Sequence, residues 1–447
     1  MALSQESKMR KQIFNTLFIW ILFSAVTTEV IFSQESDKGI GGSPYSAYGI
    51  GLPQDITSHN FRGQGLIGVS GITGEFNTLA NPAIWGSAFL TQATTGLNLS
   101  KFKLDDGSSV EETSNLSSGY LHIVLPLSRS KLGLSLSLYP VSRSNFRILE
   151  SNSFLNTTSD TVNFRNEVRS AGGVNKFEIG LGFKITNNIY FGYAPSVAFM
   201  NLENSEEIQY DVPGFIAQTQ SSSVTGAAFS QRFGISANYS KLFSEQDRIS
   251  FGATLNLPYT IGGKRDFTSQ KEINGVNQTV DLSSTISTPK GDVYIPLEAS
   301  FGIGYSPSPF FNFATEGVFQ KWSEFTNDIK PSDEAVMTDR LKLGVGGQYH
   351  PYKRNSNSFF SRFKYSGGVS YDTGHLTIQG NDISTLWINT GLGILGRNSA
   401  TIFPSMDLSF QYGFRGTNEN NLIMERIWTF GFSLNLNEHM FIRPKLR

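Results

Sequence analysis

Long segments of alternating apolar and polar residues dominate the chain after residue 87. The last of them, residues 428–436, reads WTFGFSLNL, so that aromatic and leucine side chains alternate with Thr, Gly, Ser and Asn. Successive side chains of a β-strand point to opposite faces, and such a segment therefore has one oily face and one small polar face. Residues 132–138 and 408–414 repeat the pattern, as do residues 251–259, in which we expect Tyr259 to share the oily face with Leu255.

We count about 14 candidate strands, near 88–102, 115–127, 131–149, 174–186, 189–211, 222–240, 248–266, 290–307, 310–322, 338–351, 359–374, 384–397, 402–414 and 424–436. Most exceed the ~5–6 residues usual in soluble sheets and reach the ~9–11 residues that a tilted strand needs to cross a bilayer. The strands of a soluble β-sandwich also alternate apolar and polar residues. Strand length and the connections must therefore decide between a sandwich and a membrane barrel.

The connections alternate between short and long. Residues 128–130, 187–188 and 306–309 form tight links, whereas 150–173, 267–289 and 323–337 are longer and polar. Short periplasmic turns and long external loops are typical of bacterial outer-membrane barrels. The sequence therefore predicts an all-β fold, a transmembrane antiparallel β-barrel of about 14 strands over residues 88–447.

The composition agrees with a barrel and excludes several kinds of site. Charged residues make up 16% of the chain and aromatic residues 13%, against ~25% charged in typical soluble chains. There is no cysteine, which excludes disulfides, thiolate nucleophiles and Cys-ligated metals. The net charge of -1 gives no reason to expect a nucleic-acid partner.

The first 33 residues have the parts of a secretory signal. Lys8, Arg10 and Lys11 precede an apolar stretch at 13–23, and small residues allow cleavage near Ser33 and Gln34. The stretch is short for a membrane span, and we interpret residues 1–33 as a cleaved signal peptide. An N-terminal anchor helix is the alternative. For an exported chain with the predicted β-barrel, we expect a location in the outer membrane of a Gram-negative bacterium.

Residues 34–87 are rich in Gly and Ser and lack the long alternation. A barrel of about 14 strands is too wide for its own side chains to fill, since ~8 strands is the size that fills itself. We therefore expect residues 34–87 to form an N-terminal hatch, or plug, inside the barrel. A disordered periplasmic tail is the alternative. Two Gly-x-Gly-x-x-Gly matches, at 63–68 and 391–396, more plausibly allow close backbone approach than dinucleotide binding.

Five stretches with a characteristic order and spacing are EFNTLANPA at 75–83, IPLEASFGIGYSPSPFFNFATEGVFQKWSEF at 295–325, LKLGVGGQY at 341–349, GVSYDT at 368–373 and NTGLG at 389–393. Together they resemble the FadL/TodX family of outer-membrane transporters for long-chain fatty acids and aromatic hydrocarbons. The resemblance implies a 14-stranded barrel with an N-terminal hatch, and a junction between hatch and first strand at Asn81, Pro82 and Ala83. Segment 43–51 has no counterpart that we can place, and the sequence ends on a basic tail at 441–447 where such barrels often end on an aromatic strand residue.

Charged residues fall on the polar, inward side of several strands, at Lys184, Arg232, Glu298, Lys342, Arg362 and Lys364. A charge on the lipid face costs ~2–4 kcal/mol at mid-depth, so inward placement is expected. We take Arg232 and Lys342 as candidates to bind a ligand carboxylate, at the polar end of a mostly apolar lumen pocket. The more ordinary role is pairing with carboxylates of the plug or of neighbouring strands.

Pro140 and Pro258 lie within predicted strands. Proline cannot donate to the strand ladder, so each marks a bulge, a kink or a strand end. A kink there is a candidate for a sideways opening in the wall. Alternatively, both prolines lie beyond the membrane zone.

The leading functional prediction is passive uptake of hydrophobic small molecules, fatty-acid-like or aromatic, through a hatch-gated barrel. We expect a monomer that contacts outer-membrane lipid, without cofactor, metal or enzymatic activity. A second hypothesis is a protein-binding barrel, a component or shuttle of a type IX-like secretion apparatus. A third is an outer-membrane hydrolase with a Ser–His pair, for instance around His122.

Overall fold

The computed structural model describes residues 41–71, 78–155, 161–212, 216–273, 276–281, 290–329, 335–351, 359–396 and 402–438. The predicted signal peptide at 1–33, the first residues of the predicted hatch at 34–40 and the basic tail at 441–447 lie outside the described residues.

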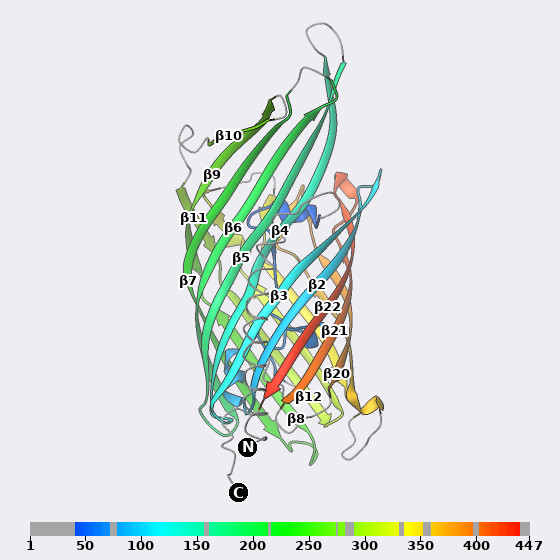
Figure 1. Cartoon of the computed structure of the whole chain (residues 1–447). Coiled ribbons are helices and arrows are strands. Elements are labelled where there is room, and N and C mark those ends of the chain that lie inside the picture. The colour runs from blue at the N-terminus through cyan, green and yellow to red at the C-terminus, as the bar shows by residue number, and fades with distance from the viewer. Residues whose placement is uncertain are drawn as a thin grey trace, which may run out of the picture.

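The described strands form a closed antiparallel barrel of 14 strands, of the outer-membrane type, which confirms the predicted fold class (Figure 1). Two of the 14 are interrupted, as β8/β9 and β11/β12. The wall consists of β2 (Thr91–Asp105), β3 (Val110–Ser128), β4 (Leu132–Leu155), β5 (Thr161–Lys184), β6 (Ile189–Tyr210), β7 (Gln218–Ser240), β8 (Arg248–Asn256), β9 (Tyr259–Ile273), β11 (Lys290–Ile295), β12 (Glu298–Ser308), β13 (Phe311–Gln320), β16 (Arg340–Tyr349), β17 (Phe363–Asp372), β20 (Thr385–Leu395), β21 (Ile402–Arg415) and β22 (Met424–Glu438).

Short elements complete the described chain. They are η1 (Pro44–Ala47), β1 (Leu52–Pro53), α2 (His59–Arg62), η2 (Pro82–Ser87), β10 (Val276–Asp281), η3 (Trp322–Glu324), β14 (Thr326–Asn327), β15 (Ala335–Met337), η4 (Phe359–Arg362), β18 (Leu376–Ile378), β19 (Asn381–Asp382) and η5 (Glu419–Asn421). Among the residues that the structure describes, no helix is long and apolar enough to cross a membrane.

Pairing between the first and last wall strands closes the barrel. β2 and β22 run antiparallel in unbroken register from Thr91↔Glu438 to Asp105↔Met424. The start of the first strand and the end of the last therefore lie at the same end of the barrel.

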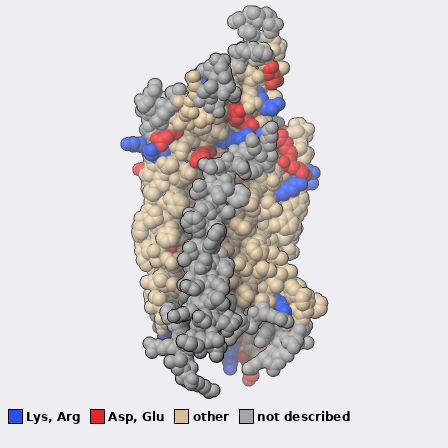
Figure 2. Space-filling view, viewed as in Figure 1, with Lys and Arg blue, Asp and Glu red and all other residues tan. Residues whose placement is uncertain are grey.

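The outward side chains of the wall are mostly apolar and exposed. Examples from four strands are Ile179, Ile303, Val345 and Phe432, which are all at least 40% exposed. In Figure 2, charged side chains gather toward the two ends, and the belt between them carries few. An apolar belt between polar ends is what contact with a bilayer requires.

Part of the predicted external loop at 150–173 is strand instead. β4 continues to Leu155 and β5 begins at Thr161, and β9 likewise continues into the predicted loop 267–289 as far as Ile273. Figure 1 shows β4 to β7 rising well above the rest of the barrel as a tall sheet. These extensions could not be predicted from the sequence, because polar strands outside a bilayer lack an oily face to mark them.

Both predicted prolines mark irregularities in the wall. The pairing of β4 with β5 shifts between Pro140 and Ser142, which is a bulge, and Pro258 lies in the break between β8 and β9. Each irregularity shifts the alternation by one residue. Tyr259 is consequently buried on the inside at 7% exposure. The prediction that it lies on the oily outer face is therefore wrong.

Beyond these irregularities part of the inner face becomes apolar. Val174, Met200, Ile261 and Val293 from the wall pack with Ile50 in one buried cluster. Buried serines such as Ser144 and Ser170 keep part of the inner face polar above the shift, so the change to apolar residues affects only the positions that contribute to this cluster. Above the shift, the tall sheet has its own hydrophobic core facing inward.

Candidate functional site

Residues 41–71 and 78–87, which we call the luminal segment, lie against the inner wall of the barrel. Most of their side chains are buried. β1 pairs with β4 near one end, at Leu52↔Arg143, and η2 packs against β5 and β6 near the other. The segment therefore runs through much of the length of the barrel.

β1 fills a place where two wall strands separate. The backbone pairing of β3 with β4 ends at Leu121↔Leu138, below the bulge at Pro140. Beyond that point β1 pairs with β4, and the Gln54 backbone N–H donates to Val141 O at 2.8 Å. The separation lies beside Pro140, one of the two positions predicted to open the wall, and the luminal segment occupies it. A sideways opening there stays a prediction, as it does at Pro258.

Wall glycines make the close approach possible. A Cβ atom added to Gly346 or Gly368 would lie 1.8 or 1.9 Å from Gln64 O, and one added to Gly252 would lie 1.8 Å from Val69 O. Any larger residue would push the segment off the wall. Gly63 likewise lies against Gly391, which confirms the interpretation of the two Gly-x-Gly-x-x-Gly matches as packing glycines.

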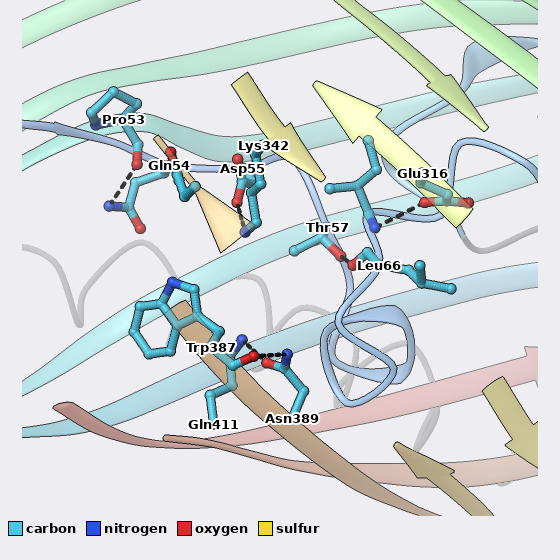
Figure 3. Close-up of polar contacts among 12 residues, drawn as sticks. Pro53, Gln54, Asp55, Thr57, Leu66, Glu316, Lys342, Trp387, Asn389 and Gln411 are labelled. Atoms are coloured by element: carbon cyan, nitrogen blue, oxygen red, sulfur yellow. Dashed lines mark hydrogen bonds and ion pairs between the residues drawn. The ribbon is translucent and has the colours of Figure 1, made fainter. Parts of the chain in front are cut away.

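Asp55 anchors the middle of the segment to the wall by charge. Its carboxylate pairs with Arg340 at 2.9 Å and with Lys342, and Arg340 also binds Asp372. Figure 3 shows the Asp55 and Lys342 side chains pointing toward one another across the gap between segment and strand. Burial alone would raise the pKa of Asp55, but the two cations outweigh it and hold the pKa below its usual value.

Glu316 of β13 holds the next turn of the segment. Its carboxylate accepts hydrogen bonds from the backbone N–H groups of Ile67 at 2.9 Å, Gly68 at 2.6 Å and Ser70 at 2.8 Å, and from the Ser70 hydroxyl at 2.6 Å. Both carboxylate oxygens are used, and the side chain is buried. Four hydrogen bonds to one buried charge make this the most concentrated polar contact between segment and wall.

The predicted hatch junction lies near η2. Asn81 caps this helix by accepting from the Ala83 N–H at 3.0 Å, and its side-chain amide donates to Val69 O and to Ile235 O of β7, both at 3.0 Å. Pro82 lies against Gly192 and Gly234 of the wall. The three residues thus join the segment, the wall and the approach to β2, although their role as a functional junction stays a prediction.

Arg232 faces the lumen, as the alternation predicts, and is 1% exposed. It binds Glu178 through Nε at 3.1 Å and Nη2 at 2.5 Å, and it donates to Ala80 O of the segment at 2.8 Å. Both predicted ligand-binding cations therefore have carboxylate partners, Glu178 for Arg232 and Asp55 for Lys342. The structure matches the more ordinary role named for them, and carboxylate-ligand binding by either stays a prediction.

The outer mouth is covered by the luminal segment and by short strands of the external connections. Tyr45 of η1 packs with Leu376, Ile378 and Ile383, and its hydroxyl donates to Ile423 O at 2.6 Å. β15, β18 and β19 form a small separate sheet there. Figure 1 places η1 inside the upper part of the barrel.

A cavity of about 180 Å³ remains between the luminal segment and the wall. Its lining is mainly hydroxyl, amide and charged side chains, including Asn115, Ser117, Ser370 and Gln411. The mostly apolar lumen pocket expected from the sequence is wrong for this cavity. The inward positions of the wall are small polar residues here, and the segment adds charges of its own.

The main anchors of the segment could not be identified from sequence. One feature of the sequence could have indicated Glu316, because it is a lone carboxylate at an inward position of a long predicted strand. No such feature indicated Asp55, because its segment has no regular period that would show which side chains meet the wall.

The Ser–His pair considered for a hydrolase is buried in the wall. His122 Nε2 lies 3.0 Å from Ser135 Oγ, and both residues are about 1% exposed. His122 packs against Trp85 of the luminal segment, with ring centroids 5.8 Å apart, so a substrate could not reach this hydroxyl while the segment is in place. In the described part of the chain, no group of three or more His, Cys, Asp or Glu side chains is placed to hold a metal ion.

Solved structures share the fold. The crystal structure of a Pseudomonas aeruginosa FadL homologue has a TM-score of 0.54 at 12% identity, with 87% of this chain and 99% of that chain covered. The Ralstonia pickettii toluene transporter TbuX has a TM-score of 0.50 at 12% identity, with 89% and 99% covered. These likenesses confirm the predicted FadL/TodX-like barrel at the level of the fold.

Sequence comparison places the chain in a family. A search of curated proteins gives no match. A family model described as BamG matches residues 9–447, nearly the whole chain. The protein with this filled outer-membrane barrel therefore belongs to the BamG family.

Proposed function

We propose that this protein is an outer-membrane channel for hydrophobic small molecules in which the luminal segment is the gate. The observation that carries the proposal is a segment, joined to the first strand, that fills the lumen of a FadL-like barrel. One structure of this fold is described as a toluene transporter. Small aromatic hydrocarbons and fatty-acid-like compounds are the corresponding substrate class.

Opening requires the segment to move, because its contacts close the lumen. Buried ion pairs at Asp55 and the Glu316 hydrogen bonds must break or rearrange for a solute to pass. Breaking a buried pair by removing one partner costs about 3–5 kcal/mol. The structure therefore corresponds to the resting, closed state of such a channel.

A second candidate is a non-transporting, protein-binding component of an outer-membrane apparatus, such as a type IX-like secretion system. The polar lining of the cavity favours it, since a hydrocarbon gains nothing from hydroxyl and amide side chains. In that case the segment would fill the barrel permanently and the outer surfaces would carry the function.

Dye entry into cells separates the two candidates. Uptake of a fluorescent hydrophobic dye is compared in cells that lack the gene, cells with the wild type and cells with residues 39–74 deleted. A gated channel predicts more entry with the wild type than without it, and still more with the deletion. Heat-modifiable mobility on gels establishes that the deletion variant contains a folded barrel.

Equal dye entry with and without the wild-type protein would reject the channel and favour the protein-binding candidate. If the deletion variant does not fold, Glu316→Gln replaces it, since this variant keeps the whole segment and weakens one anchor. Unchanged entry in a folded, segment-free barrel would show that the luminal segment is not the gate.

A further inference from the structure

The charges around the cavity between luminal segment and wall do not balance. Among the described residues, five cationic side chains line it, from Arg62, Arg143, Arg340, Lys342 and Arg415, against the carboxylates of Asp55 and Asp372. Glu425 adds one further negative charge by pairing with Arg415 at 3.1 Å. The cavity therefore has a formal excess of positive charge.

Arg62 is held in this lining by a neutral amide rather than by a carboxylate. Its Nη1 donates to Asn98 Oδ1 at 2.6 Å, and none of the ion pairs within the described residues includes it. A guanidinium has five N–H donors, so most of those of Arg62 remain for water or a ligand. By contrast, Arg340 and Lys342 are held by Asp55 and Asp372.

The rest of the lining suits a polar ligand. Hydroxyl and amide groups come from Asn115, Ser117, Ser370, Gln411 and Thr429, on four different strands and facing one space. A volume of about 180 Å³ is more than ten times the ~10–15 Å³ that one water needs. A hydrocarbon tail would leave these groups without partners, and a cation would meet like charge.

We propose that this cavity binds a small hydrophilic oxyanion, a phosphate group free or on a polyol of sugar size, with Arg62 as its charged contact. Phosphate oxygens accept several charge-assisted hydrogen bonds, and guanidinium is the side chain best shaped to supply them. Because Arg62 belongs to the luminal segment and Asn98 to β2, a bound anion would bridge segment and wall. It would stabilise the filled state of the barrel by preferential binding. This inference goes beyond the proposed function and does not depend on transport.

The test is calorimetric titration of the purified full-length protein in detergent with inorganic phosphate, glucose 6-phosphate and neutral glucose. We expect the two phosphates to bind and glucose not to bind. Arg62→Gln should weaken phosphate binding about tenfold or more, as the loss of a charged hydrogen bond predicts. Lys101→Gln is the matched control, since Lys101 is an exposed cation paired with Glu112 on the outer face, and it should bind as the wild type does.

Asn98→Asp keeps Arg62 and supplies it with a fixed counter-ion, so it should also weaken phosphate binding about tenfold or more. This variant carries the test if Arg62→Gln fails to fold. Binding by both variants with wild-type affinity, or no binding of phosphate and glucose 6-phosphate by a folded wild type, would overturn the proposal. A further titration uses a short-chain phosphatidic acid. Binding of this lipid without binding of the soluble phosphates would also overturn it, because the ligand would then be a lipid head group.

Discussion

At the scale of single residues, a few buried charges fix the luminal segment. Glu316 satisfies three backbone N–H groups that would otherwise be buried without partners, and Asp55 pairs with two wall cations. The sequence predicted that charged residues would face inward, and Arg232 and Lys342 do. It could not predict their partners, because Glu178 and Asp55 become neighbours only once strands and segment are assembled.

Glu316→Gln tests the residue-scale account. The amide offers one acceptor oxygen where the carboxylate has two, and it places an N–H₂ group against backbone N–H donors. We expect a loss of about 1–3 kcal/mol in the free energy that holds the segment in place. Limited proteolysis of the folded protein should cut within residues 60–80 in this variant and not in the wild type.

The control is Glu324→Gln, because Glu324 is exposed and pairs only at the surface with Lys321. That change should alter stability by no more than ~0.5 kcal/mol. Identical protease resistance in Glu316→Gln and the wild type would contradict the role given to this carboxylate.

At the scale of the strands, alternation predicts much of the barrel and fails at identifiable points. The wall strands begin and end near the predicted positions because the oily outer face marks them. Two features differ from the prediction for different reasons, namely the inward position of Tyr259 and the extension of β4 to Leu155. A one-residue shift at Leu257–Pro258 reverses the faces, and a polar strand beyond the bilayer has no oily face to detect.

Two adjacent glycines of β17 give a matched test of how strand and segment fit. A Cβ on Gly368 would lie 1.9 Å from Gln64 O, whereas one on Gly367 would lie 3.7 Å from its nearest neighbour, Asn389 O. We expect Gly368→Ala to cost about 1–3 kcal/mol by overpacking and Gly367→Ala to stay within ~0.5 kcal/mol.

Denaturant unfolding of the two variants in the same detergent measures this difference. The same midpoint for both would show that the backbone of the segment does not rest on this strand. A lower midpoint for Gly367→Ala than for Gly368→Ala would contradict the assignment of inner and outer faces.

At the scale of the whole molecule, the described residues of the luminal segment pack against the inner wall along much of the barrel. The Gly-rich composition of residues 34–87 and the diameter of a barrel of about 14 strands predicted a plug, and residues 34–40 and 72–77 of that plug lie outside the described residues. Composition and diameter did not predict that the segment would reach the outer mouth and pair with β4, or that the remaining cavity would be polar. Those features depend on contacts between distant residues, such as Gly42 with Asn145.

Because the chain has no cysteine, one engineered disulfide tests this central claim directly. A Cβ on Gly41 would lie 3.4 Å from Thr113 Cβ of β3, close to the ~3.5–4.5 Å of natural disulfides. Ser128, at the other end of β3, is about 50 Å away along the strand at ~3.3 Å per residue. Under mild oxidation we predict that G41C/T113C forms an intramolecular cross-link in the folded barrel and that G41C/S128C does not, as read by mass spectrometry of proteolytic fragments. Free thiols in oxidised, folded G41C/T113C, or a cross-link in G41C/S128C, would contradict a segment that fills the lumen to its outer end.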